Sequence, residues 1–147
     1  MSSQTTPVNT GSFAIVQVDR SKVFIWQNRY TKANHTNSTG ATETLLTGTL
    51  MGRISASQLV IPLASAATDG SQFPIGILAD DYTVINGATL ELAICNFGDV
   101  AEEKVIFAGS DVFATVISGR SIRDRIAADT VGIRLVTSTE MSGYDNQ

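Results

Sequence analysis

The feature that most constrains the fold is a tight turn that leads directly into an apolar strand. Residues 68–81 read TDGSQFPIGILADD, in which the pair Asp69-Gly70 precedes the apolar run 73–79. Asp-Gly pairs favour turns because both residues tolerate the backbone angles that a tight turn needs. A short apolar run bounded by such signals predicts a β-strand. We therefore expect a β-rich chain in which this stretch is a principal strand.

Strand signals recur along the rest of the chain at short intervals. The runs that we expect to form strands in the main body are 45–55, 59–65, 73–79, 88–97 and 103–109. Further turns are expected at Asn86-Gly87 and Gly98-Asp99, and spacings of about 8–12 residues are typical of sandwiches and barrels with short strands. Glycines and a proline inside the first two runs indicate bulges and edges. The predicted fold class is mainly β, a small β-barrel or β-sandwich-like domain.

The N-terminal part of the chain has a different composition. Residues 1–12 are polar with little aliphatic bulk, so we expect an arm that becomes ordered only on a partner. The runs 13–18 and 22–30 are rich in β-branched and aromatic residues and are separated by a short polar stretch, which predicts a β-hairpin. Residues 33–44 are dominated by Asn, Thr and Gly, and a polar loop is expected there.

One short helix is expected near the C-terminus. Ser121 can cap its start, with Asp124 three residues further on, and Thr130 ends it. The run 131–137 alternates apolar residues with Arg134, which predicts a closing strand. The expected organisation is a flexible arm (1–12), an N-terminal β element with its polar loop (13–44), a β domain (45–137) and a polar tail (138–147).

Composition excludes several classes of function. The 147 residues include 43% hydrophobic ones, enough for the core of a single domain. The net charge of −4 argues against nucleic-acid binding, which needs many cations. Neither a signal peptide nor a run of apolar residues long enough for a membrane span is expected. The single cysteine, Cys95, lies in an apolar run, so we expect it to be buried in the core. Because it has no partner for an intramolecular disulfide, we expect the protein to occupy a reducing compartment.

No set of residues predicts catalysis, metal binding or cofactor binding. His35 is the only histidine and lies in the Asn/Thr-rich run, where we expect it to be solvated. Adjacent acids such as Asp80-Asp81 point to opposite faces of a strand and are typical of solvated charge. Asp69 supplies too few carboxylates for calcium, and no glycine pattern fits a phosphate loop. We therefore predict no catalytic residue, no metal ligand, no cofactor and no enzymatic activity.

Two sets of side chains are candidates for protein contacts. At a strand period of two, Phe24, Trp26 and Tyr30 share one face and need to be covered, either by the core, which we favour, or by a neighbouring subunit. Residues 119–125, GRSIRDR, bring together Arg120, Arg123 and Arg125. These arginines can contact an acidic partner, although alternating charge on a short helix is more often a solvated face.

The order of these elements resembles that of the phage head decoration proteins. The resemblance depends on the Asp69-Gly70 turn before GILA at 76–79, the alternating strand 89–94, the segment 105–109 and the late short helix before a final strand. It covers roughly residues 46–137, about two thirds of the chain, and includes no catalytic motif. The strand-rich run 13–30 and the long loop after it depart from the shorter members of that family.

The resemblance implies a role on a virus particle. It implies a protein that binds the outer surface of an icosahedral capsid as a homotrimer at local threefold axes and stabilises the shell. The implied partners are the major capsid protein and further copies of the chain itself, and the implied location is the virion surface after synthesis in the host cytoplasm. The arm residues expected to contact the capsid are Ser2, Ser3, Gln4, Thr5, Thr6 and Val8.

Two alternatives remain open from the sequence alone. Short strands, glycine turns and Thr-rich loops also occur in tail-tube, neck and fibre subunits of phages. A β-barrel that binds carbohydrate is a second alternative, with Trp26, Tyr30 or Tyr82 as stacking platforms. Threefold symmetry with shell binding favours decoration, whereas glycan binding by the isolated protein favours the carbohydrate module.

Overall fold

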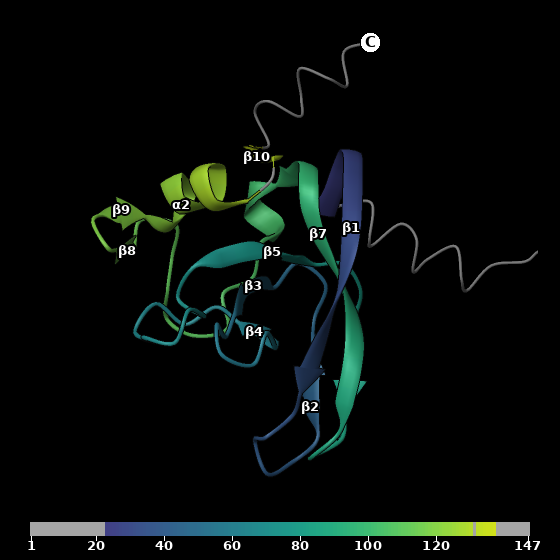
Figure 1. The fold of residues 1–147 in the computed structure, drawn as a ribbon. Coiled ribbons are helices and arrows are strands. Elements are labelled where there is room, and N and C mark those ends of the chain that lie inside the picture. The colour runs from purple at the N-terminus through teal and green to yellow at the C-terminus, as the bar shows by residue number, and fades with distance from the viewer. Residues whose placement is uncertain (1–22, 131, 138–147) are drawn as a thin grey trace, which may run out of the picture.

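The computed structural model describes residues 23–130 and 132–137, which form an open β-sheet with small flanking elements (Figure 1). Strands take 48% of these residues and helices 11%, which confirms a mainly β chain with one short helix near its C-terminus. The predicted arm at 1–12, strand at 13–18 and tail at 138–147 lie outside the described residues. The elements are β1 (Phe24–Thr36), β2 (Glu43–Leu45), β3 (Leu50–Arg53), β4 (Val60–Pro62), β5 (Pro74–Leu78), β6 (Tyr82–Val84), β7 (Thr89–Ala101), the 3-10 helix η1 (Glu102–Lys104), β8 (Val116–Ile117), β9 (Arg120–Ser121), α2 (Ile122–Asp129) and β10 (Gly132–Val136).

The main sheet has the strand order β1-β7-β5-β3-β4, and all of these neighbours are antiparallel. β10 adds to the sheet in parallel with the last part of β7, on residues 97–101. β1 and β7 form a long two-stranded ribbon that projects beyond the other strands, where β2 lies against it (Figure 1). Two small sheets, β2 with β6 and β8 with β9, complete the described fold.

The predicted barrel does not close within the described residues, so that part of the fold prediction is wrong. The outer strands β1 and β4 share no ladder. β4 is three residues long, and Pro62, which cannot donate a backbone hydrogen bond, is tolerated on such an edge strand. A side chain joins these two strands instead. A ring nitrogen of His35 on β1 lies 2.7 Å from the carbonyl oxygen of Val60 on β4.

Apolar side chains cover both faces of the central strands, which explains why those strands are nearly continuous apolar runs. Ile77 and Cys95 belong to the cluster that also includes Ile122 and Ile126 of α2. Their neighbours Leu78 and Ile94 point to the opposite face and pack in a second cluster with residues of β2, β4 and β6. Cys95 is fully buried, as predicted.

The helix α2 begins and ends where its capping residues predict. The Ser121 hydroxyl accepts a hydrogen bond from the Asp124 N–H, and Thr130 follows the last helical residue. Ile122 and Ile126, one turn apart, are buried against the sheet. β10 then buries Ile133 and exposes Arg134, in agreement with the predicted alternation.

The structure corrects two predicted element boundaries. The run 103–109 does not form a strand, because η1 occupies its start and Ile106 makes only an isolated bridge to Thr49. The polar loop expected at 33–44 is shorter, because β1 continues to Thr36 and β2 begins at Glu43. The backbone of Asn37 pairs with the turn before β7, and its side chain donates to the Val84 carbonyl, so even this polar stretch is fixed by hydrogen bonds.

The turn at Asp69-Gly70 is present and is closed by its own side chains. The Asp69 carboxylate accepts hydrogen bonds from the hydroxyl and the N–H of Ser71, which lower the pKa of this carboxyl below its ordinary value. β5 follows directly, as predicted.

No helix in the described ranges is long and apolar enough to cross a membrane.

Candidate functional site

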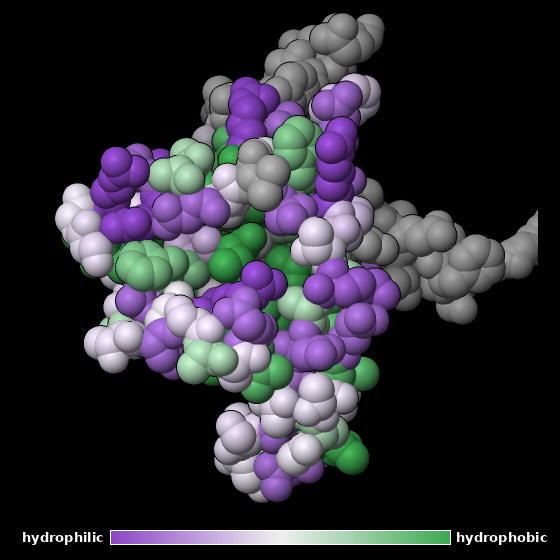
Figure 2. Space-filling view, in the orientation of Figure 1, coloured by the Kyte–Doolittle hydropathy of each residue, from purple (hydrophilic) through white to green (hydrophobic). Residues whose placement is uncertain are grey.

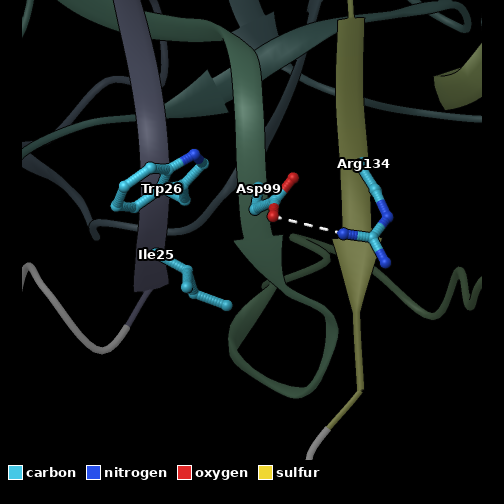
Figure 3. Close-up of a pocket in the computed structure, with 4 residues that line it drawn as sticks. All are labelled: Ile25, Trp26, Asp99 and Arg134. Atoms are coloured by element: carbon cyan, nitrogen blue, oxygen red, sulfur yellow. Dashed lines mark hydrogen bonds and ion pairs between the residues drawn. The ribbon is translucent and has the colours of Figure 1, made fainter. Parts of the chain in front are cut away.

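Three strands of the main sheet meet around a hollow of about 530 Å³ (Figure 3). Ile25 and Trp26 come from β1, Asp99 from β7 and Arg134 from β10. Trp26 is 63% exposed, and the Arg134 guanidinium donates to the Asp99 carboxylate at 3.3 Å. A large exposed aromatic ring beside an ion pair at its rim is a combination suited to protein contact.

The backbone around Trp26 is irregular, and glycine at position 98 permits this irregularity. The register between β1 and β7 shifts on both sides of Trp26, and Gly98 has a φ of 105°. A Cβ atom at position 98 would lie 2.6 Å from the Trp26 carbonyl oxygen. β7 continues through this position as one strand, so the turn predicted at Gly98-Asp99 is wrong. The glycine lies opposite a β-bulge of β1, in which two residues face this single one, instead of forming a turn.

Asn28 bonds the two strands where their ladder is interrupted. Its side-chain amide donates to the carbonyl of Asp99 at 3.0 Å and to the carbonyl of Phe97 at 3.4 Å. These carbonyls lie opposite the irregular part of β1, and a buried carbonyl without a donor is costly. The Asn28 amide therefore replaces ladder bonds and holds the bulge that presents Trp26.

The structure separates the aromatic side chains that were expected to share one face. Phe24 is buried in the core, whereas Trp26 and Tyr30 are exposed. Tyr30 still contacts the edge of the Phe24 ring, with ring centroids 5.7 Å apart. The prediction fails for Trp26 because the period of two holds only along an unbroken strand, and the bulge interrupts it. A role of these three residues in an interface stays a prediction.

Arg123 of α2 turns back onto the body of the protein. Both of its terminal nitrogens donate to the Glu102 carboxylate, and its guanidinium lies over the Phe113 ring, 5.0 Å from the centroid. This ion pair holds the pKa of the Glu102 carboxyl below its ordinary value, mainly through the hydrogen bonds from Arg123. The pair therefore fastens η1 to α2.

The lowered pKa predicts how the contribution of this pair depends on pH. A depressed carboxyl pKa stabilises the fold above the unfolded-state value of about 4.3, and the contribution disappears as pH falls through the lower folded-state value. We expect Glu102→Gln to lower the free energy of unfolding by about 0.5–1 kcal/mol at pH 7, because the pair is partly exposed. Denaturant titrations at pH 7 and at pH 3 measure this difference. A loss that is equally large at both pH values contradicts the assignment.

The other two arginines near α2 differ in their availability. The Arg125 side chain donates to the carbonyls of Ile117 and Ser118, both at 3.1 Å, and lies over the Phe73 ring. Arg120, in β9, is exposed at the tip of the small β8–β9 sheet. Of the three arginines predicted as contacts, the structure thus leaves Arg120 the most accessible to a partner.

His35 is not a solvated loop residue, and that prediction is wrong. It lies within β1 and is 2% exposed. One ring nitrogen contacts the Val60 carbonyl and the other contacts the Glu43 carboxylate, each at 2.7 Å. Both contacts are to structural groups, and no cluster of three or more His, Cys, Asp or Glu side chains that could hold a metal ion occurs among the described residues.

The remaining candidate groups also have structural partners. Asp81 accepts hydrogen bonds from the N–H and the hydroxyl of Thr47, at 2.7 and 2.9 Å. The Tyr82 hydroxyl accepts from the Ala93 N–H, and its ring packs against the second core cluster. Tyr82 is therefore only partly exposed and is a poor stacking platform for a sugar.

Exposed apolar side chains are scattered over the surface. In the space-filling view, apolar patches alternate with polar side chains instead of forming one broad face (Figure 2). Scattered single residues are normal for a soluble surface, whereas an exposed tryptophan beside a hollow is not. The large apolar residues exposed among the described ones are Trp26, Tyr30, Leu46, Ile85, Leu90, Val112 and Val116.

Sequence reasoning found only part of this site. It singled out Trp26 and placed Arg134 on the outward face of the last strand, but it did not bring the two together. Asp99 was placed in a turn, and Ile25 gave no signal of its own. The parallel pairing of β10 with β7 unites these residues, and no local pattern encodes it. The arm residues Ser2, Ser3, Gln4, Thr5, Thr6 and Val8 lie outside the described residues.

Comparison with protein families identifies a matching family. The family model described as bacteriophage lambda head decoration protein D matches residues 20–112, more than half of the chain. The match includes Trp26, the bulge at Gly98 and Asp99, whereas α2 and β10 follow it. A search of curated proteins found no match.

Proposed function

Because the chain belongs to the family of bacteriophage lambda head decoration protein D, we propose that it binds an icosahedral phage capsid as a homotrimer at the local threefold axes and stabilises the assembled shell. Membership gives the chain a role in decorating a phage capsid and a place on the outer surface of the virion. The trimer, the threefold position, the stabilisation and the major capsid protein as direct partner are our proposal. Synthesis in the host cytoplasm before assembly belongs to the same proposal.

The observation that most supports self-association is the exposed Trp26 beside its hollow. The ring stands on a rigid strand pair whose bulge is fixed by Asn28 and Gly98. Tryptophan and arginine are enriched among the residues that dominate interface energetics, and the hollow contains both, as Trp26 and Arg134. We assign this surface to the contact between neighbouring copies in the trimer.

Replacing Trp26 by alanine tests this assignment. An aromatic anchor at the centre of an interface contributes about 2 kcal/mol or more, so we expect Trp26→Ala to weaken trimer formation by about thirtyfold or more. Sedimentation equilibrium of the purified protein measures the change. Ile85→Ala is the matched control, because Ile85 is 65% exposed and lies on the β6–β7 turn. Equal self-association of Trp26→Ala, Ile85→Ala and the unchanged protein contradicts the assignment.

A decoration protein needs no chemistry to stabilise a shell. It binds the assembled shell better than the separate subunits, and any ligand stabilises the state that it prefers by mass action. Three copies joined in one trimer bind multivalently, so contacts that are individually weak give slow release. The polar arm at residues 1–12 suits an added strand on the capsid, because main-chain hydrogen bonds require little sequence specificity.

Removal of residues 1–12 separates capsid binding from folding. We expect the truncated protein to fold and to form trimers, because the described core begins at Val23, but to lose capsid binding. Cryo-electron microscopy of each protein mixed with expanded, DNA-free capsids of its own virus measures occupancy. Density over the local threefold positions with the full chain supports the proposal, and bare capsids refute it. Full occupancy by the truncated protein contradicts the role of the arm alone.

A further inference from the structure

A second crevice, of about 350 Å³, lies beside β7 between the segment that pairs with β5 and the segment that pairs with β10. β5 pairs with β7 only at Ile94 and Cys95, whereas β10 begins its pairing at Phe97. Asn96 lies at this exchange point and lines the crevice. Because the two neighbours of β7 diverge here, the sheet leaves a gap between them that no backbone fills.

Arg53, at the end of β3, lines this crevice and supplies a guanidinium group in addition to the ammonium group of Lys32. Its Nε atom is buried and has no hydrogen-bond partner, and it is the only buried side-chain nitrogen or oxygen of that kind in the part of the chain that the structure describes. A buried donor without an acceptor is costly, and more so when it belongs to a charged group. The guanidinium of Arg53 is therefore held beside the crevice with part of its donor capacity unmet by the described residues.

The other charges around the crevice are already paired. Lys32 lies 3.5 Å from Glu91 on the surface, and Asp129 lies 3.5 Å from Arg125. The acidic residue of the lining, Asp129, is therefore paired with a cation other than Arg53. Thr31 and Asn96 add a hydroxyl and an amide to the lining, so donors are available for an anionic guest.

The apolar residues of the lining favour an acidic side chain over a bare phosphate as the bound anion. Ile75 and Ile94 form an apolar wall beside the guanidinium. An acidic side chain matches this wall, because its methylene groups contact the isoleucines while its carboxylate accepts from Arg53 in the planar geometry that arginine favours. A bare phosphate has no apolar part with which to use the wall.

We propose that this crevice receives the carboxylate of an acidic side chain of the major capsid protein, with Arg53 as its principal ligand. The inference rests on the function proposed above, in which the hollow at Trp26 is assigned to contacts between copies and the shell is the remaining protein partner. It gives the body of the protein a specific contact with the capsid besides that of the arm.

Binding of a simple carboxylate to the isolated full-length protein tests the site itself. The probe is glutarate, and the readout is the NMR signal of the arginine Nε–H groups. We expect one of these signals to shift in a saturable way and to be absent from the Arg53→Lys variant, which keeps the charge but lacks this donor. Absence of any saturable shift, or an equal response to chloride, overturns the carboxylate site.

Capsid binding by Arg53→Gln tests the partner. We expect the affinity of the full-length protein for expanded capsids to fall about tenfold or more, because truncation of one member of a buried charge pair is costly. Arg29→Gln is the matched control, since Arg29 is an exposed arginine on β1 that lies over the Phe97 ring. Thermal unfolding establishes that both variants are folded, and if Arg53→Gln is not, Arg53→Lys replaces it.

The outcomes separate this inference from the function on which it rests. If the unchanged protein binds capsids and Arg53→Gln binds equally well, the inference is overturned and the proposed function stands. If the unchanged protein does not bind capsids, the proposed function fails, and the capsid protein is overturned as the occupant. A glutarate response that is lost in Arg53→Lys still supports a carboxylate site in that case.

Discussion

Gly98→Ala is expected to lower the free energy of unfolding by about 2–5 kcal/mol. Two costs add at this position. Its φ of 105° lies outside the regions that residues with a side chain adopt readily, and the added Cβ atom would lie within 2.8 Å of three backbone atoms of the opposite strand. Backbone cannot move aside as a flexible side chain can, so the bulge must open. Urea denaturation of the purified protein measures the loss.

Gly87→Ala is the matched control for this prediction. Gly87 also has a positive φ, 82°, but a Cβ atom there would meet no atom within 4 Å. We expect it to cost only about 1 kcal/mol, from the backbone angle alone. The difference between the two variants isolates the close approach of β1 to β7. If both lose the same stability, the bulge at Gly98 is not the constraint that we describe.

Gly98→Ala is also expected to change the proposed contact surface at Trp26. Opening the bulge displaces the segment that presents Trp26 and the Asn28 amide that bonds to β7. We therefore expect the change to affect self-association beyond its effect on folding. The same glycine thus serves the strand pairing and the shape of the hollow in which Trp26 lies.

Elements defined by local signals could be predicted from the sequence. Asp69-Gly70 fixes a turn and residues 73–79 supply a strand, because both depend on neighbouring residues only. Ser121 and Thr130 delimit the helix for the same reason. The burial of Cys95 followed from the apolar run around it.

Features that depend on distant partners could not be predicted. Gly98 has the sequence signature of a turn residue, and only its pairing with β1 shows that it lies within a strand, opposite a bulge. The run 105–109 is as apolar as a strand, but it bridges Thr49 at a single point and no neighbour continues the ladder. The parallel pairing of β10 with β7, which brings Arg134 to Asp99, has no signature in the residues near either strand.

His35 is the clearest example of a residue whose role comes from a distant contact. Its sequence neighbours are polar, so exposure was the natural expectation. In the fold, β1 carries it beneath β4 and β2, where it reaches the Val60 carbonyl and the Glu43 carboxylate. A carbonyl oxygen can only accept, so the nitrogen facing Val60 carries a proton, which fixes one orientation of the ring.

His35 also explains how an open sheet holds its curved shape. β1 and β4 are the two ends of the strand order, and a closed barrel would join them by ladder hydrogen bonds. The imidazole ring spans the interval between them instead. The imidazole therefore joins β1 and β4 at this seam, alongside the apolar packing of Val60 and Ala33 in the second core cluster.

We accordingly expect His35→Ala to lower the free energy of unfolding by about 3–5 kcal/mol, because it removes both ring contacts, leaves the buried Val60 carbonyl without its donor and opens a cavity. Urea denaturation measures the loss, and hydrogen exchange at β2 and β4 locates it. Lys32→Ala is the control, because it removes an exposed ion pair on the same strand that contributes about 1 kcal/mol or less. Equal losses in the two variants would show that the imidazole stabilises the fold no more than an exposed ion pair does, and would contradict its role at the seam. A large loss confined to β2 and β4 would establish His35 as the group that fastens the seam.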